Sequence, residues 1–488
     1  MAVPEKLKVL FATSEAAPLI KTGGLADVSA ALPAALNALG VDVRVILPGY
    51  PQIMDALKTR SRAAKLPGFP GVPPANLLAS RMPSGLPLFV LECPIYERAG
   101  GPYQDGGATD WPDNDLRFGL FSYVCALLST PASPFAAWTP DIVHCNDWQT
   151  GLTPVYLNYV NGPRARTIMT IHNLAFQGLF PAQTALRLGL PPQAFAIEGV
   201  EYYGSLSFLK GGLQFADRIT TVSPSYAREI QSAPLGMGLE GVVARRKDVL
   251  TGILNGIDVE AWDPESDPYI ARYYDASRLA AKQDNKRALQ SRMGLRDEPQ
   301  TPLFGVVGRL TEQKGLDVLA EVAGELVGLP AQLALLGAGD PALQREFQEL
   351  AQRHPGQIAV QIGFDEGLSH QIEAGADVFV MPSRFEPCGL NQMYSQRYGT
   401  PPLVHGTGGL LDSVVDCTPA TLKDRTATGF VFTPLDAPTL LENCRRAASA
   451  YADARIWRQL QKNGMQRDFS WEARAQQYLD LYRVLAVG

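Results

Sequence analysis

A short apolar run and a helical stripe alternate at the start of the chain. Residues 7–13 include an uninterrupted apolar stretch, which is typical of a buried strand. Further on, apolar side chains recur at helical spacing and stop at a glycine, at Val28, Leu32, Leu36, Leu39 and Gly40. A second apolar run, residues 41–47, follows. The pattern predicts a strand–loop–helix–strand unit, most simply a right-handed parallel crossover.

Three later apolar runs end in polar side chains. They are residues 141–147, 167–173 and 218–223, and the second ends at His172 and Asn173. In an open α/β sheet, ligands bind outside the carboxyl ends of the strands, so polar groups delivered there by several strands indicate a binding edge. A lone histidine is usually structural, but His172 occupies a position where chemistry would take place.

A second series of strands and helices follows a Gly- and Pro-rich stretch at residues 233–241. Its predicted strands are residues 304–307, 333–336, 358–362, 378–381 and 430–432. Predicted helices alternate with them and start near Gly315, Pro341, Leu368 and Leu390. This alternation predicts a parallel sheet with helices on both faces.

The fold class predicted from these patterns is α/β, with two Rossmann-like, doubly wound parallel-sheet domains. At about 150 residues per domain, a chain of 488 residues is expected to hold two to three. We place the first domain at residues 1–248 and the second at residues 249–467. The last segment, 468–488, holds an amphipathic helix that we expect to pack back on the first domain. The Pro/Gly-rich residues 66–87 are predicted to form a surface excursion.

Composition narrows the classes of function. Hydrophobic residues make up 46% and charged residues 19% of the chain, as in a globular protein. The net charge of −6 argues against a nucleic-acid partner, which usually meets a basic face. No window approaches 18 uninterrupted apolar residues, so no membrane span is expected. Glu15 interrupts the N-terminal apolar run, and we expect no signal peptide.

The six cysteines are scattered along the chain without a C-x-x-C pair. Such spacing in a long chain favours reduced thiols in the cytoplasm over a disulfide framework. Zinc motifs and a G-x-S-x-G nucleophile elbow are absent from the sequence, and we expect no metal site and no cofactor.

Residues 21–24 (KTGG) lie between the first strand and the first helix. Gly23 and Gly24 would let a ligand approach the backbone closely, and the helix start offers unpaired N–H groups to an anion. Lys21 adds a full positive charge, and Asp27 follows in the first turn. A tight turn that requires glycine is the alternative explanation. The four features together favour a phosphate or sugar site, although the loop is not a P-loop.

The second half offers a comparable loop at residues 308–315 (GRLTEQKG). Arg309 and Lys314 can converge on one anion, and the forked guanidinium suits bidentate phosphate contact. Exposed basic residues are more often plain surface, but their position at a strand end favours function here. Residues 337–342 (GAGDPA) match G-x-G-x-x-A only formally, because no acidic residue ends a strand about 20 positions later.

Residues 381–398 are the segment richest in candidate chemistry. Glu386 and the following Cys388, Gly389 and Leu390 lie between a strand and a helix, so a carboxylate stands beside free backbone N–H groups. A carboxylate can hold sugar hydroxyls, whereas in the alternative explanation Glu386 only caps the helix. Residues 100–117 form a loop dense in Asp with two aromatic residues, which suits either a sugar polymer or plain solvent exposure.

Four motifs, KTGGLADV, GRLTEQKG, RFEPCGL and GTGGLLDSVVD, occur in this order and together resemble the family of bacterial glycogen synthases and plastid starch synthases. The similarity runs over nearly the whole chain. It implies the GT-B fold, two Rossmann-like halves with the active site in the cleft between them. It also implies retaining transfer of glucose from ADP-glucose to the non-reducing end of an α-1,4-glucan such as glycogen.

The resemblance assigns roles to residues that match the motifs. Lys21 with the backbone of Gly23 and Gly24 is expected to contact the donor phosphates and sugar, and Arg309 and Lys314 to clamp the diphosphate. Glu386 is expected to hold the donor glucose, and His172 to lie near its anomeric carbon. The remaining expected donor contacts are Asp27, Asp147, Asn255, Phe364 (against adenine), Cys388, Gly389 and Leu390.

The sequence departs from the family pattern at three positions. Asn146 and Gln149 stand where many relatives carry histidines, and Asn391 replaces a common threonine. Three alternatives stay open: a GT-B enzyme using UDP-glucose, a sugar-nucleotide epimerase on the same scaffold, and a non-catalytic glucan-binding protein. The sequence is compatible with a homo-oligomer.

Overall fold

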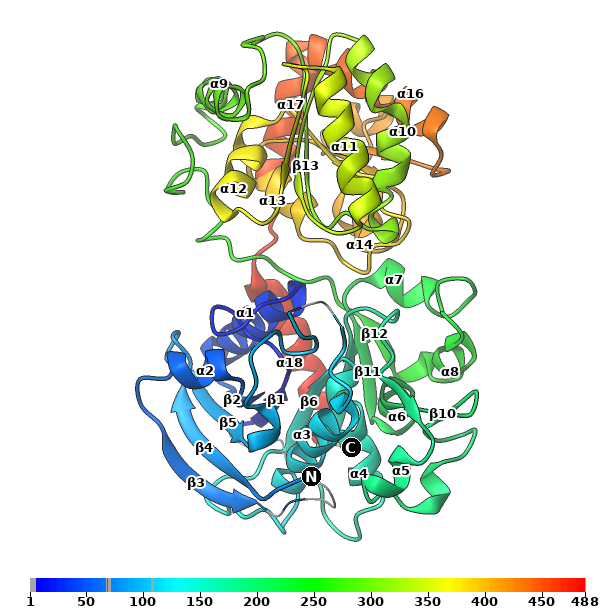
Figure 1. The fold of residues 1–488 in the computed structure, drawn as a ribbon. Coiled ribbons are helices and arrows are strands. Elements are labelled where there is room, and N and C mark those ends of the chain that lie inside the picture. Colours follow the sequence, from blue (N-terminus) through cyan, green and yellow to red (C-terminus); the bar gives the residue numbers. More distant parts are fainter. Residues whose placement is uncertain (1–5, 67, 69–71, 107–108, 488) are drawn as a thin grey trace. The chain divides into compact units, whose positions relative to one another are not determined.

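The computed structural model describes residues 6–66, 68, 72–106 and 109–487 and divides the chain into two compact units (Figure 1). The first unit comprises Met1–Gly256 and Trp471–Gly488, and the second comprises Ile257–Ser470. The sequence-based boundary after residue 248 is therefore wrong, because β12 (Leu250–Gly252) pairs with β11 (Arg218–Thr221) in the first sheet. The return to the first unit comes at Trp471, slightly later than predicted.

The main sheet of the first unit has the strand order β12-β11-β7-β6-β1-β2-β5-β4-β3. In this order, the strands from β12 to β5 are all parallel to one another. Besides β12 and β11, these strands are β1 (Lys8–Ala12), β2 (Asp42–Pro48), β5 (Pro87–Glu92), β6 (Ile142–Asn146) and β7 (Arg166–Ile171). At the edge, β4 (Ala75–Arg81) and β3 (Ser61–Leu66) pair antiparallel. The sheet is thus mixed, and the predicted excursion at 66–87 contains a strand in its described part.

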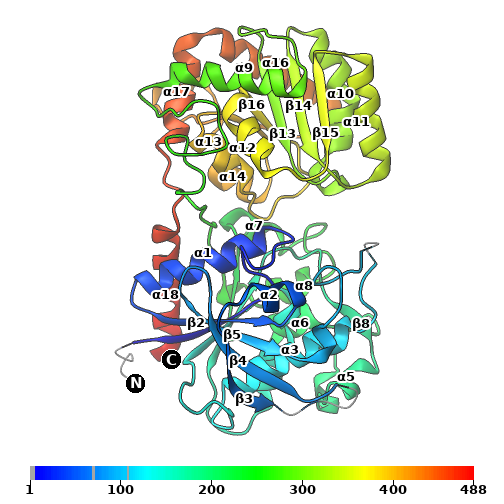
Figure 2. The ribbon, with the colours of Figure 1, turned by 60° about the vertical axis from the view of Figure 1, so that its left-hand side comes forward.

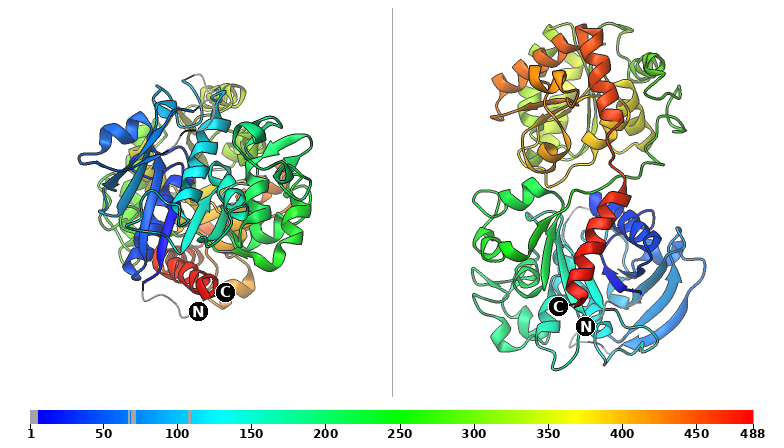
Figure 3. Two further views of the ribbon diagram at one scale, coloured as in Figure 1. Left: turned by 90° about the horizontal axis from the view of Figure 1, so that it is seen from below. Right: turned by 180° about the vertical axis from the view of Figure 1, so that it is seen from behind.

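Helices cover this sheet, and the C-terminal helix is one of them. α18 (Trp471–Val487) runs beside α1 (Gly24–Ala38) (Figure 3). The C-terminal helix therefore packs on the first unit, as predicted. Its Tyr482 hydroxyl lies 2.7 Å from Nδ1 of buried His144 on β6. The other helices are α2 (Pro51–Ala56), α3 (Asn114–Leu128), α4 (Leu152–Asn158), α5 (Thr184–Arg187), α6 (Phe208–Phe215), α7 (Pro224–Glu229) and α8 (Glu240–Arg245). A small antiparallel sheet is formed by β8 (Leu179–Pro181), β9 (Glu201–Tyr202) and β10 (Ser205–Ser207).

The second unit is built on a parallel sheet of order β15-β14-β13-β16-β17-β18. Its strands are β13 (Leu303–Val307), β14 (Gln332–Gly337), β15 (Ile358–Ile362), β16 (Val378–Met381), β17 (Pro402–His405) and β18 (Phe430–Phe432). Alternate strand residues enter two different cores: Phe304 belongs to one, and Leu303 to the other. This period of two places helices on both faces, which is the predicted doubly wound arrangement.

Some helices on the two faces of this sheet were predicted from the sequence, and others were not. α10 (Leu316–Gly328) and α11 (Pro341–Arg353) lie side by side along β14 and β15 (Figure 2). With α12 (Glu366–Gly375) and α13 (Asn391–Arg397), they match the predicted starts within a few residues. The prediction omitted β17 and several helices: α9 (Lys282–Met293), α14 (Gly408–Ser413), α15 (Pro419–Lys423), α16 (Ala437–Ala452) and α17 (Ala454–Met465).

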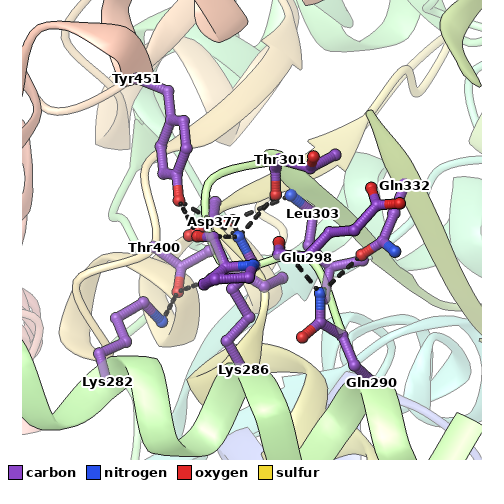
Figure 4. Close-up of polar contacts among 12 residues, drawn as sticks. Lys282, Lys286, Gln290, Glu298, Thr301, Leu303, Gln332, Asp377, Thr400 and Tyr451 are labelled. Carbon is purple, nitrogen blue, oxygen red and sulfur yellow. Dashed lines mark hydrogen bonds and ion pairs between the residues drawn. The ribbon is translucent and has the colours of Figure 1, made fainter. Parts of the chain in front are cut away.

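A buried ion pair joins α9 to the second sheet. Lys286 Nζ lies 2.7 Å from Asp377 Oδ2, and the two side chains are 1% and 6% exposed (Figure 4). Lys286 also donates to the carbonyl of Thr301 at 2.6 Å, and Asp377 accepts from the backbone N–H of Leu303 at 2.9 Å. Because both charges are paired and hydrogen-bonded, this network fixes α9 against the strand that leads to Arg309.

Candidate functional site

The loop that carries Lys21 ends in the exposed start of α1. Gly23 is the N-cap of this 15-residue helix, and a glycine has no side chain with which to cap it. The backbone of Gly23 is extended, at φ −160°, and a Cβ placed there would meet no atom within 4 Å. The turn itself therefore does not require glycine at this position, which removes the main support for the tight-turn explanation. The side chain of Lys21 pairs with Asp27 at 2.8 Å and remains about half exposed.

Glu15 holds this loop in place through hydrogen bonds. Its buried carboxylate accepts hydrogen bonds from the backbone N–H of Thr22 at 2.5 Å and from the Thr22 hydroxyl at 2.6 Å. The hydroxyl of Tyr103, from the acidic loop at 100–117, donates to the same carboxylate at 2.6 Å. Residues 107–108 of that loop lie outside the described residues. Glu15 thus ties the two loops together, a role that sequence reasoning missed.

Asp147 and His172 meet at the carboxyl ends of β6 and β7. The Asp147 carboxylate accepts the backbone N–H of His172 at 2.7 Å, and Asp147 adopts a left-handed backbone conformation at φ 54°. Burial raises the pKa of Asp147 to about 7, partly offset by the backbone N–H groups of His172 and Asn173, and the charge of Glu15 also raises it. Burial lowers the pKa of His172 to about 3, so its imidazole is neutral near pH 7.

Asn255 follows β12 and lies in the first unit, not in the second domain where the predicted boundary placed it. The residue is 5% exposed, and its Oδ1 has no hydrogen-bond partner among the described residues. A buried amide oxygen without a partner is uncommon, because it costs roughly 1–3 kcal/mol. An acceptor left open in this way is suited to a donor group of a ligand.

The second unit carries a cluster of charged groups at the ends of β13 and β16. Lys314 Nζ lies 2.5 Å from Glu386 Oε2, and the hydroxyl of Ser383 donates to the same oxygen at 3.0 Å. The side chains of Lys314 and Glu386 are 22% and 8% exposed. Arg309 is exposed, and within the described part of the chain its guanidinium has no ion-pair or hydrogen-bond partner.

The two loops of this cluster are bonded to each other. Arg384 donates from its backbone N–H to the carbonyl of Gln313 at 2.8 Å, and its guanidinium binds Asp317 through both nitrogens at 2.7 and 2.6 Å. Gly315, at φ 62°, passes so close to Pro382 that a Cβ would lie 1.8 Å from the carbonyl oxygen. The sequence thus requires glycine there, and Lys314 and Glu386 are held in one rigid arrangement.

Cys388, Gly389 and Leu390 contribute backbone rather than side-chain chemistry. Cys388 is buried, and Gly409 packs so tightly on its backbone that a Cβ would lie 2.2 Å from the Cys388 carbonyl oxygen. Gly389 has φ 73°, and Leu390 precedes the first residue of α13. Among the described residues, the Glu386 carboxylate binds Lys314 and Ser383 and makes no hydrogen bond to the first turn of α13.

Phe364 is exposed, whereas the glycines of residues 337–342 are closely packed. Phe364 follows β15 at the same edge of the sheet, and the residue is 85% exposed. Gly337 and Gly339 pack against backbone: added Cβ atoms would lie 2.1 Å from Gly308 O and 2.3 Å from Leu310 O. Close packing of β14 therefore explains these glycines without a dinucleotide.

The structure groups the predicted residues into two sets, one in each unit. The first unit brings Asp147 and His172 into contact and adds Glu15, whereas Lys21 contacts Asp27 alone in this set. The second unit brings Lys314 and Glu386 into contact. Throughout the described ranges, no three His, Cys, Asp or Glu side chains are grouped to hold a metal ion. Among the same residues, no helix is long and apolar enough to cross a membrane.

Comparisons with known proteins agree with this arrangement. Residues 8–245 match the family model of the starch synthase catalytic domain, and residues 291–463 match that of group 1 glycosyl transferases. The chain is 55% identical to a glycogen synthase of Nitrosomonas eutropha over 99% of this chain and 97% of the relative. It is likewise 55% identical to a glycogen synthase of Nitrosomonas europaea, over 98% and 97%.

Solved structures show the same fold. The catalytic domain of starch synthase IV from Arabidopsis thaliana, bound to ADP and acarbose, superposes with a TM-score of 0.89 at 32% identity, over 99% of this chain and all of that one. A sucrose-phosphate synthase from Thermosynechococcus elongatus, at 19% identity and a TM-score of 0.58, shares the fold, again over 99% of this chain and all of that one. The chain therefore belongs to the family of glycogen and starch synthases, glycosyltransferases with the GT-B fold.

Proposed function

We propose that this chain transfers glucose from ADP-glucose to the non-reducing end of an α-1,4-glucan such as glycogen, with retention of the α configuration and release of ADP. The observation that carries the proposal is the charged cluster of the second unit. Arg309, whose guanidinium has no partner among the described residues, stands in one short loop with Lys314, which is already bonded to buried Glu386. A protein that only bound glucan would have no use for such a cluster.

Departure of ADP concentrates negative charge on the diphosphate. Arg309 and Lys314 would stabilise that charge more strongly in the transition state than in the bound donor, which is the condition for catalysis. At an effective dielectric near 20, one charge pair at 4 Å contributes about 4 kcal/mol before desolvation costs. α10 begins at Leu316, two residues after Lys314, and its N-terminus adds partial positive charge.

The sugar acquires positive charge at the anomeric carbon while ADP leaves. Glu386 can accept hydrogen bonds from glucose hydroxyls, and Lys314 holds its carboxylate in place. Asp147 is bonded to the backbone of His172, and we assign it a structural role beside the sugar rather than that of a nucleophile. We propose front-face attack, in which the departing phosphate accepts the proton of the acceptor hydroxyl.

Selectivity for ADP-glucose is supported by two features. The starch synthase at 32% identity was solved with ADP bound, and Phe364 of this chain presents an exposed ring at the end of β15. An aromatic face of this kind can stack on adenine, although it would accept uracil less well because the smaller base offers less area. UDP-glucose remains the principal alternative donor.

A donor comparison tests the proposal. Purified full-length protein would be incubated with glycogen and either ADP-glucose or UDP-glucose, and both nucleotide release and incorporated glucose would be measured. We expect incorporation from ADP-glucose at a kcat/KM at least tenfold above that from UDP-glucose. Incorporation from UDP-glucose alone would support the alternative donor. Glucan binding without incorporation from either donor would support a non-catalytic binding protein.

A further inference from the structure

Asn146 is the last residue of β6, and its side chain contacts that of His172. The residue is 1% exposed, and its Nδ2 donates to the carbonyl of Ala12 at 3.0 Å and to that of His144 at 3.4 Å. A carbonyl oxygen can only accept, so these two contacts fix which end of the amide is nitrogen. The remaining atom, Oδ1, lies 2.9 Å from Nε2 of His172.

This orientation determines the tautomer of His172. Because Oδ1 of Asn146 is an acceptor, Nε2 of His172 must carry the hydrogen. The ring is neutral, since burial lowers its pKa, and the lone pair therefore resides on Nδ1. The contrast with His144 is informative: both of its ring nitrogens are occupied inside the fold, by Tyr482 and by Thr170.

We propose that Asn146 is a positioning residue that holds His172 in the Nε2–H form, so that Nδ1 accepts a hydrogen bond from a hydroxyl of the donor sugar. The assignment of this hydroxyl to the donor sugar rests on the proposed function, whereas the assignment of the tautomer does not. Asn146 itself would not touch the substrate, because it is almost wholly covered.

The chemistry favours a neutral acceptor at this place. A protonated imidazole would repel the positive charge that develops at the anomeric carbon, whereas a neutral ring with its lone pair outward would not. The charged and titratable groups around His172 are Asp147, which binds its backbone N–H, Glu15 beyond Asp147, and neutral His144 on the adjacent strand. In the described part of the chain none of them contacts Nε2, whose hydrogen-bond partner is Oδ1 of Asn146, so Asn146 sets the tautomer.

The tautomer can be read directly in the unmodified protein. The chain has five histidines, so long-range ¹H–¹⁵N spectra of full-length protein with ¹⁵N-labelled histidine can be assigned with His172→Gln as the reference. We expect His172 to be neutral and protonated at Nε2 at pH 7. A ring that is protonated at Nδ1, or charged, would overturn the proposal even if the protein transfers glucose as proposed.

Two substitutions test whether this tautomer of His172 matters for catalysis. Asn146→Asp places a carboxylate at Nε2, which favours the charged ring, so the acidic limb of the kcat profile should move upward by at least one pH unit. Asn146→Leu removes the acceptor, and kcat should fall about 10–100-fold with little change in KM for the glucan. A purely structural role would lower the melting temperature of both variants but leave the pH profile of kcat in place, and that outcome would refute the assignment.

Discussion

Replacement of Lys314 by alanine separates catalysis from folding in the second unit. The substitution removes one of two cations that face the leaving diphosphate in the proposed mechanism. Loss of a single preorganised charge-stabilising donor costs roughly 10²–10³-fold in kcat, or about 3–4 kcal/mol. We therefore expect Lys314→Ala to lower kcat by at least 100-fold, measured as ADP release in the presence of glycogen.

The same substitution leaves Glu386 without its cation. At 2.5 Å and an effective dielectric near 20, the gross attraction between the two groups is about 7 kcal/mol. Desolvation and the 22% exposure of Lys314 reduce the net loss of unfolding free energy to about 2 kcal/mol, between the values for exposed and buried pairs. A unit of this size would then melt about 4–8 °C lower and remain folded at 25 °C.

The double variant Lys314→Ala/Glu386→Gln distinguishes the two effects. Neutralising Glu386 removes the unpaired buried charge, so the melting temperature should recover while kcat stays low. Lys462→Ala, an exposed lysine on α17, is the matched control and should change neither quantity. Wild-type turnover in Lys314→Ala, or recovery of turnover in the double variant, would refute the role of Lys314 in charge stabilisation.

Four further predictions address other parts of the molecule. Phe364→Ala should raise KM for ADP-glucose about tenfold with kcat nearly unchanged, because the ring is exposed and supports nothing in the fold; an unchanged KM would exclude base stacking. Lys286→Met should lower the unfolding free energy by about 3–5 kcal/mol, since it leaves Asp377 buried and unpaired, and urea unfolding would measure it against the exposed-site control Lys423→Met. Burial raises the pKa of Asp147 from 3.8 to about 7, so ionisation of its carboxyl group destabilises the fold as pH rises between these values. Asp147→Asn should therefore raise the melting temperature more at pH 8 than at pH 4. Equal shifts at the two pH values would show that burial does not raise this pKa. Transfer should persist in excess chelator, and loss of activity that Mg²⁺ restores would contradict metal independence.

The fold was predictable wherever the apolar pattern was local and regular. The unit formed by β1, α1 and β2 follows from uninterrupted runs and a helical stripe, and both are confirmed. β4 was missed because turn-forming residues flank it, and its strand character depends on antiparallel pairing with β5. The domain boundary was misplaced for a similar reason, since only pairing with β11 shows that β12 belongs to the first sheet.

The candidate site was predictable in residue type but not in its connections. Polar groups at strand ends pointed to Asp147, His172 and Glu386, and the structure gives each a specific bonded neighbour. Glu15 appeared in the sequence only as a polar break after an apolar run, although that position at a strand end was a usable signal. Its contact with Tyr103 joins residues that are 88 positions apart, which no local pattern encodes.

The anomeric signals of the product report both the stereochemistry and the stoichiometry of the proposed transfer. ADP-glucose and a maltooligosaccharide acceptor would be mixed with the full-length protein, and ¹H NMR would monitor new glycosidic linkages together with ADP. We expect one new α-1,4 linkage at the non-reducing end for each ADP released. New β linkages, or ADP release accompanied only by free glucose, would contradict it.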